Sequence, residues 1–134
     1  MIKIMFILVL SFFIHSCYSS NESIQVVKFQ KENIPSDNIS EYSAQCKTWV
    51  LDKSSILEIL ETSDTITAHE KNYIFNTLSC EYKGEVLIKG KEYNFVINAG
   101  SYSVIYDNEH TYYLGYFKKK NFFLVKPDIE QVQN

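Results

Sequence analysis

The second half of the chain is dominated by alternating hydrophobic and polar positions. In residues 80–89, cysteine, tyrosine, valine and isoleucine share one set of alternate positions, while glutamate and lysine occupy most of the other. Residues 93–99 continue the pattern, with Asn94 and Asn98 opposite the apolar face. A period of two residues indicates strands that are buried on one side. Together with segments 102–106, 111–117 and 122–125, these strands are joined by short turns and predict an antiparallel β-meander of about five strands.

The first half of the chain carries the helical patterns. Apolar residues recur at helical spacing in residues 54–62, where Ser55 and Glu58 have the spacing of a capping box. A weaker helix is predicted for residues 67–76 with a second capping box at Thr67 and Glu70, although its last residues could instead begin a strand. The stretch CKTWVL, residues 46–51, is β-branched and aromatic and predicts a strand containing a buried Trp49, and a short strand is possible at 26–29. The expected class is therefore α+β, with one or two helices beside the meander.

The N-terminus has the pattern of an export signal. Lys3 precedes an apolar run of 11 residues, Ile4 to Ile14, which as a helix would be about 16 Å long and would cross about half of a bilayer core. That length is typical of the central region of a signal peptide. The sequence Ile14-His15-Ser16-Cys17 resembles the lipobox of bacterial lipoproteins, and this resemblance implies cleavage before Cys17 and acylation of its thiol.

We therefore expect a signal peptide at 1–16, a lipid-anchored tether at 17–25 and one globular domain at 26–134. The alternative is plain secretion, with cleavage a few residues later, for example after Ser19. Asp commonly follows the cysteine in lipoproteins that stay at the inner membrane, but Tyr18 stands there. The resemblance thus implies an outer-membrane location facing the periplasm, in a bacterial cell envelope.

The cysteine count fits this interpretation. The chain has three cysteines, and acylation of Cys17 would leave Cys46 and Cys80 as an even pair in an oxidising compartment, where cysteines normally form disulfides. Closing a loop of this length would stabilise the fold by about 3 to 4 kcal/mol in the chain-entropy model. The alternative, two free or metal-binding thiols, lacks further ligands at suitable spacing.

Composition narrows the classes of function. The chain contains no arginine, and the 12 lysines and 16 acidic residues after Ser16 give a net charge of −4, which argues against a nucleic-acid partner. His69-Glu70 is not followed by the second histidine of a zinc protease, and His110 falls in a predicted turn. No phosphate-binding glycine loop or serine nucleophile motif occurs. We therefore expect no enzymatic activity, no cofactor and no metal.

The tyrosines are candidates for a partner surface. Seven of the ten lie between Tyr82 and Tyr116, and Tyr112, Tyr113 and Tyr116 cannot all point to one face of a strand. Either these three pack internally against a helix, or they form a surface that contacts a protein partner, where tyrosine is favoured. The run Lys118-Lys119-Lys120 is expected at a solvated turn, with contact to anionic lipid or an acidic partner as the alternative.

Three motifs resemble a group of small exported bacterial proteins over residues 46–125. They are the Cys-x-x-Trp of residues 46–49, the Cys-Glu-Tyr-Lys-Gly of residues 80–84, and the Ile-Asn-Ala-Gly of residues 97–100. Members often carry a second cysteine pair near the last hairpin, where this chain has Tyr116 and Phe117. Some members look like immunity proteins that accompany secreted antibacterial toxins. The resemblance implies a lipid-anchored, protein-binding module that acts as an immunity protein or enzyme inhibitor. The alternatives are an envelope structural lipoprotein without a discrete ligand and an enzyme of unrecognised type.

Overall fold

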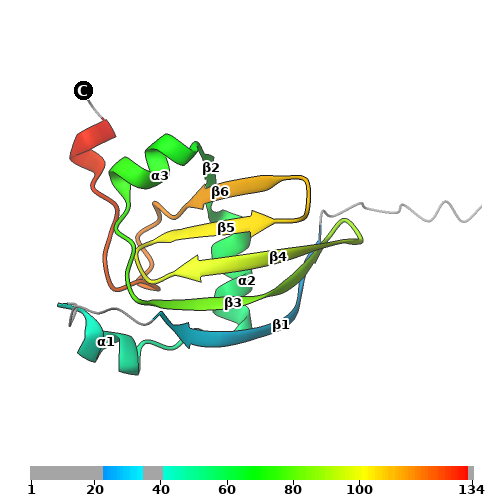
Figure 1. Cartoon of the computed structure of the whole chain (residues 1–134), viewed down its shortest axis with the longest axis horizontal. Coiled ribbons are helices and arrows are strands. Elements are labelled where there is room, and N and C mark those ends of the chain that lie inside the picture. The colour runs from blue at the N-terminus through cyan, green and yellow to red at the C-terminus, as the bar shows by residue number, and fades with distance from the viewer. Residues whose placement is uncertain (1–22, 35–40, 133–134) are drawn as a thin grey trace, which may run out of the picture.

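A computed structural model describes residues 23–34 and 41–132 (Figure 1). The expected signal peptide at 1–16, the acylation site Cys17 and most of the tether at 17–25 lie outside the described residues. The first strand, β1 (Ile24–Asn33), begins inside the segment expected to be a tether and is much longer than the short strand predicted at 26–29.

The described residues form an α+β fold around one six-stranded antiparallel sheet. The strand order is β1, β3 (Cys80–Ile88), β4 (Lys91–Asn98), β5 (Tyr102–Tyr106), β6 (Thr111–Gly115) and β2 (Asp64–Ile66). Strands β3 to β6 confirm four strands of the predicted meander. The fifth, predicted at 122–125, is wrong, because β2 pairs with β6 at that edge of the sheet.

Three α-helices and one short 3₁₀-helix accompany the sheet. These are α1 (Ser43–Thr48), α2 (Lys53–Thr62), α3 (Ala68–Ile74) and η1 (Ile129–Val132). In Figure 1, α2 lies behind the sheet, whereas α3 lies beside β2 and β6. None of the described helices is long and apolar enough to cross a membrane.

The predicted helices are confirmed, with one correction to their caps. Thr67 and Glu70 form the expected capping box at the start of α3. The box predicted at Ser55 and Glu58 is wrong: the capping residue is Asp52, three residues earlier, and its side chain accepts a hydrogen bond from the Ser55 N–H at 2.7 Å. Asp is as favourable as Ser at this position.

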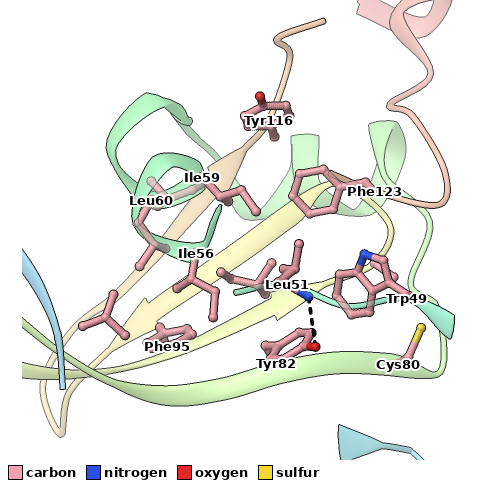
Figure 2. Close-up of a cluster of buried hydrophobic side chains, with 14 of the residues drawn as sticks. Trp49, Leu51, Ile56, Ile59, Leu60, Cys80, Tyr82, Phe95, Tyr116 and Phe123 are labelled. Carbon is pink, nitrogen blue, oxygen red and sulfur yellow. Dashed lines mark hydrogen bonds between the residues drawn. The ribbon is translucent and has the colours of Figure 1, made fainter. Parts of the chain in front are cut away.

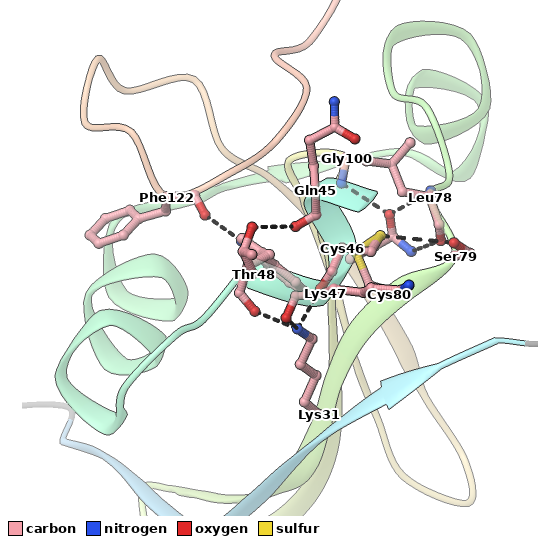
Figure 3. The surroundings of a disulfide bond; sticks show 12 residues. Lys31, Gln45, Cys46, Lys47, Thr48, Leu78, Ser79, Cys80, Gly100 and Phe122 are labelled. Carbon is pink, nitrogen blue, oxygen red and sulfur yellow. Dashed lines mark hydrogen bonds between the residues drawn. A yellow bond between two sulfur atoms is a disulfide. The ribbon is translucent and has the colours of Figure 1, made fainter. Parts of the chain in front are cut away.

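The strand predicted at 46–51 is also wrong, because residues 43–48 form α1. Tertiary contacts override the β-propensity of this stretch. The Lys31 ammonium group, from β1, donates hydrogen bonds to the carbonyl oxygens of Cys46 and Trp49 (Figure 3). A cation at the C-terminal end of a helix satisfies carbonyl groups that have no partner within the helix.

The main core lies between α2 and one face of the sheet, which we call the helix face (Figure 2). Ile56 and Ile59 from α2 and Phe95 and Ile97 from β4 are each at most 1% exposed. Trp49 lies in this core as predicted. Its ring meets that of Tyr82 edge-on at 5.1 Å, and its Nε1–H donates to the Phe122 carbonyl oxygen at 2.8 Å. The Tyr82 hydroxyl in turn accepts from the Leu51 N–H at 3.0 Å.

The predicted disulfide between Cys46 and Cys80 is present, with 5.6 Å between the two Cα atoms (Figure 3). It joins the middle of α1 to the first residue of β3, and both cysteines are buried. The bond thereby fixes α1 and the following Trp49 against the sheet.

Candidate functional site

The second face of the sheet includes three long rows of side chains that run across the strands. Because neighbouring residues of a strand point to opposite faces, the strand registers define each row. The first row contains Lys28, Glu85, Asn94, Tyr106 and Thr111. The second row contains Gln30, Lys83, Val96, Val104, Tyr113 and Ile66. The third row contains Glu32, Glu81, Asn98, Tyr102 and Gly115.

In the third row, Asn98, Tyr102 and Gly115 are covered by α3 and by the connector that follows it, residues 75–79. Phe75 packs edge-on against Tyr102, with the ring centroids 6.2 Å apart. The Thr77 and Tyr102 hydroxyls are hydrogen-bonded at 3.0 Å, and burial raises the pKa of the Tyr102 phenol. Asn98, predicted on the polar face of its strand, is fully buried here. Its side-chain amide accepts a hydrogen bond from the Leu78 N–H and donates one to the Leu78 carbonyl oxygen.

The first two rows stay accessible over β1, β3 and β4 and at Tyr106 of β5, and we call them the open face. Its centre is apolar and aromatic: Val96, Val104 and Tyr113 are half-buried, and Tyr106 is 37% exposed. A hollow of about 400 Å³ lies beside this centre, over β1, β3 and β4, and its lining includes Gly84, Asn94 and Tyr106. Gly84 allows β1 and β3 to approach closely, since a Cβ atom there would lie 2.0 Å from the Lys28 carbonyl oxygen.

Paired charges surround this centre. The Lys28 ammonium nitrogen lies 3.2 Å from a carboxylate oxygen of Glu85. The Lys83 ammonium nitrogen lies 3.1 Å from a carboxylate oxygen of Glu32 and 3.3 Å from one of Glu81. Two hydrogen bonds raise the pKa of Lys83: the one to Glu32 contributes most and the one to Glu81 contributes next. The pKa of Glu32 is lowered, first by a hydrogen bond from Gln30 and then by Lys83. The open face therefore combines an apolar centre with surrounding charges that are already paired, most of them exposed to solvent.

The structure does not bring the three predicted tyrosines together. Tyr116 is 3% exposed and packs in the helix-face core against Phe123, with ring centroids 5.2 Å apart. Tyr112 also points to the helix face, where it is 44% exposed and meets Tyr93 edge-on. Only Tyr113 belongs to the open face.

Tyr106 is the exposed aromatic residue of the open face that the sequence interpretation missed. The signal was available in the alternation of Tyr102, Val104 and Tyr106 along one strand, which places an apolar series opposite Ser103 and Ile105.

The two histidines of the described residues belong to neither row of the open face. The His69 ring lies against that of Tyr73 in α3 in a tilted arrangement, with the ring centroids 4.2 Å apart. His110 lies in the β5–β6 turn, with its Nδ1 atom 3.7 Å from an Asp107 oxygen. Asp107 also accepts hydrogen bonds from the Lys91 ammonium and from the backbone N–H groups of Glu109 and His110, and these bonds hold the pKa of its carboxyl well below its usual range. Within residues 23–34 and 41–132, no group of histidine, cysteine and acidic side chains is placed to hold a metal ion.

No family model, curated protein or solved structure matches the chain. The open face is therefore interpreted from its own composition and geometry.

Proposed function

We propose that the chain is a lipid-anchored cell-envelope protein whose domain binds another protein through the open face. The observation that carries the proposal is the exposed Tyr106, which lies on the sheet beside the half-buried side chains of Val96, Val104 and Tyr113. Protein interfaces typically combine an apolar, aromatic centre with a polar rim. Exposed apolar surface of this kind on a folded domain commonly marks a binding site.

The rim fits a protein partner better than a highly charged ligand. Lys28 and Lys83 are both paired with glutamates on the same face, so their charges are largely compensated within the domain. Such pairs set orientation and exclude water at an interface, whereas most of the binding free energy comes from the buried apolar and aromatic contacts. Tyr106 is the residue we expect to contribute most.

The resemblance of residues 46–125 to immunity-type proteins supports a more specific role, neutralisation of a toxin or inhibition of an enzyme at the envelope. The lipobox-like residues 14–17 support an anchor at Cys17, in the outer membrane facing the periplasm. Several acyl chains would make such an anchor long-lived, because each buried methylene contributes about 0.8 kcal/mol.

Affinity capture with matched variants tests the binding role. Purified protein would be incubated with envelope extract as wild type, as Tyr106→Glu and as Tyr73→Glu, which alters a tyrosine of α3 that is 63% exposed. We expect wild type and Tyr73→Glu to retain the same discrete protein and Tyr106→Glu to lose it. Recovery of no protein by the wild type, or equal recovery by all three, would count against the open face.

Mass spectrometry of the mature N-terminus tests the anchor separately. The expected species begins at an acylated Cys17. An unmodified N-terminus beyond Cys17 would reject lipidation while leaving the proposal for the open face intact.

A further inference from the structure

Residues 116–126 form a compact loop, which we call the lysine loop, that is held at both ends by the same turn of the sheet. At its start, the Tyr116 N–H donates to the Ser101 carbonyl oxygen at 2.9 Å. At its end, the Leu124 N–H donates to the Ala99 carbonyl oxygen at 3.0 Å, and the Ser101 hydroxyl donates to the Val125 carbonyl oxygen. Compact loops whose ends meet in this way are frequently functional.

The middle of the loop is fixed as well. The Trp49 indole donates to the Phe122 carbonyl oxygen, while Tyr116 and Phe123 pack into the core. The Lys120 ammonium nitrogen lies 2.7 Å from a carboxylate oxygen of Glu58 in α2 and 4.8 Å from the centre of the Phe122 ring. The lysines of this loop are therefore displayed from a backbone that is held in place before any ligand binds.

Four lysines of the loop line one hollow of about 300 Å³. They are Lys118, Lys119, Lys120 and Lys126. Its apolar lining includes Phe117, Phe123 and Ile129, the last 53% exposed. Among the described residues, Lys120 has an acidic partner, but no acidic side chain pairs with the other three lysines. A hollow lined by charges of one sign concentrates counter-ions, and here that charge is positive on a chain whose net charge is negative.

The hollow also lies at a defined end of the molecule. Ile24 pairs with Ile88, beside the β3–β4 turn, so the tether would join the domain at that end of the sheet. Tyr102 pairs with Gly115, which places the lysine loop at the opposite end of the strands. A protein anchored through the tether would thus present the lysine loop on the side away from its own membrane.

We propose that the lysine loop is a second binding site, which takes an acidic segment of a protein partner. Carboxylates of the segment would meet Lys118, Lys119 and Lys126, while an apolar side chain of the same segment would contact Ile129 and the aromatic lining. The choice of a protein segment over an anionic membrane rests on the proposed anchor. The argument that the lysine loop binds negatively charged groups depends only on the geometry of the loop and does not require the anchor.

Fluorescence anisotropy with a labelled oligoglutamate peptide containing one leucine tests the site. The matched variants are Lys118→Gln/Lys119→Gln and, as a control with the same change in net charge, Lys47→Gln/Lys53→Gln, at exposed lysines elsewhere. We expect the loop variant to bind about tenfold more weakly than wild type, because two charge pairs are lost, and the control to bind within about twofold. Binding should also weaken with added salt. Equal weakening in both variants, or no binding by the wild type, would overturn the site.

A second arm separates the two sources of negative charge. The same peptide is titrated onto protein anchored in vesicles of phosphatidylcholine alone or with phosphatidylglycerol. We expect the peptide to bind equally in both. Loss of peptide binding only on the phosphatidylglycerol vesicles would show the lysine loop occupied by lipid headgroups and would overturn the protein partner. Failure of the protein to enter any vesicle would overturn the anchor, and with it the argument for the partner, but not the peptide result.

Discussion

Replacing Asn98 by alanine should destabilise the protein more than its polar character suggests. Its Oδ1 atom accepts hydrogen bonds from the Leu78 N–H at 2.9 Å and the Gly100 N–H at 3.0 Å, and its Nδ2 donates to the Leu78 carbonyl oxygen at 2.9 Å. The side chain is 0% exposed. The substitution therefore leaves three buried backbone groups without partners. Each such group costs about 1 to 3 kcal/mol, and partial rehydration of the new cavity reduces the sum, so we expect a loss of about 3 to 6 kcal/mol.

Urea unfolding followed by the fluorescence of Trp49, the single tryptophan, measures this free energy. Asn94→Ala is the matched control, because Asn94 lies on the same strand and the same face but is exposed, and it should change stability by less than about 0.5 kcal/mol. Amide hydrogen exchange at Leu78 and Gly100 should accelerate selectively in Asn98→Ala. A loss of less than about 1 kcal/mol, with those amides still protected, would refute the role assigned to Asn98.

Three further substitutions test other parts of the structure. Replacing Cys46 and Cys80 together by alanine should lower the free energy of unfolding by about 4 kcal/mol in the chain-entropy model, as measured by urea titration, and a change below about 1 kcal/mol would contradict the stabilising role of the disulfide. Asp107→Asn should lower the melting temperature at pH 7. Because the folded pKa of Asp107 is lowered by Lys91 and two backbone N–H groups, its stabilisation is present above its unfolded pKa of about 4 and is lost as pH falls below that value. The melting temperatures of wild type and variant should therefore converge in acid, and a constant difference would contradict the assignment. Ser103→Ala should raise the free energy of unfolding by about 1 kcal/mol, because the buried Ser103 hydroxyl has no hydrogen-bond partner among the described residues; a clear loss of stability would contradict this.

The features that the sequence predicts well are those set by local pattern or by counting. Strands β3 to β6 follow from the period-two alternation, and the pairing of Cys46 with Cys80 follows from the cysteine count and the expected export. The extent of β1 was missed because a register shift between Val26 and Lys28 breaks its alternation.

The features that sequence reasoning missed depend on distant contacts. Residues 46–51 look like a strand, but the disulfide and the Lys31 ammonium hold residues 43–48 as a helix against the sheet. Asn98 sits at a position with the pattern of a solvent-facing residue and becomes buried only because the connector 75–79 crosses it. The open face is set in the same way: α3 and that connector cover part of the third row and leave Tyr106 accessible.

The central claim, that the open face binds a protein, is tested most directly by site-specific photo-crosslinking in intact cells. A benzophenone amino acid would replace Tyr106 on the open face or, as a control, the exposed Tyr73 of α3. We predict that irradiation joins the protein to one discrete partner from position 106 and not from position 73. No adduct at 106, or the same adducts from both positions, would contradict the account.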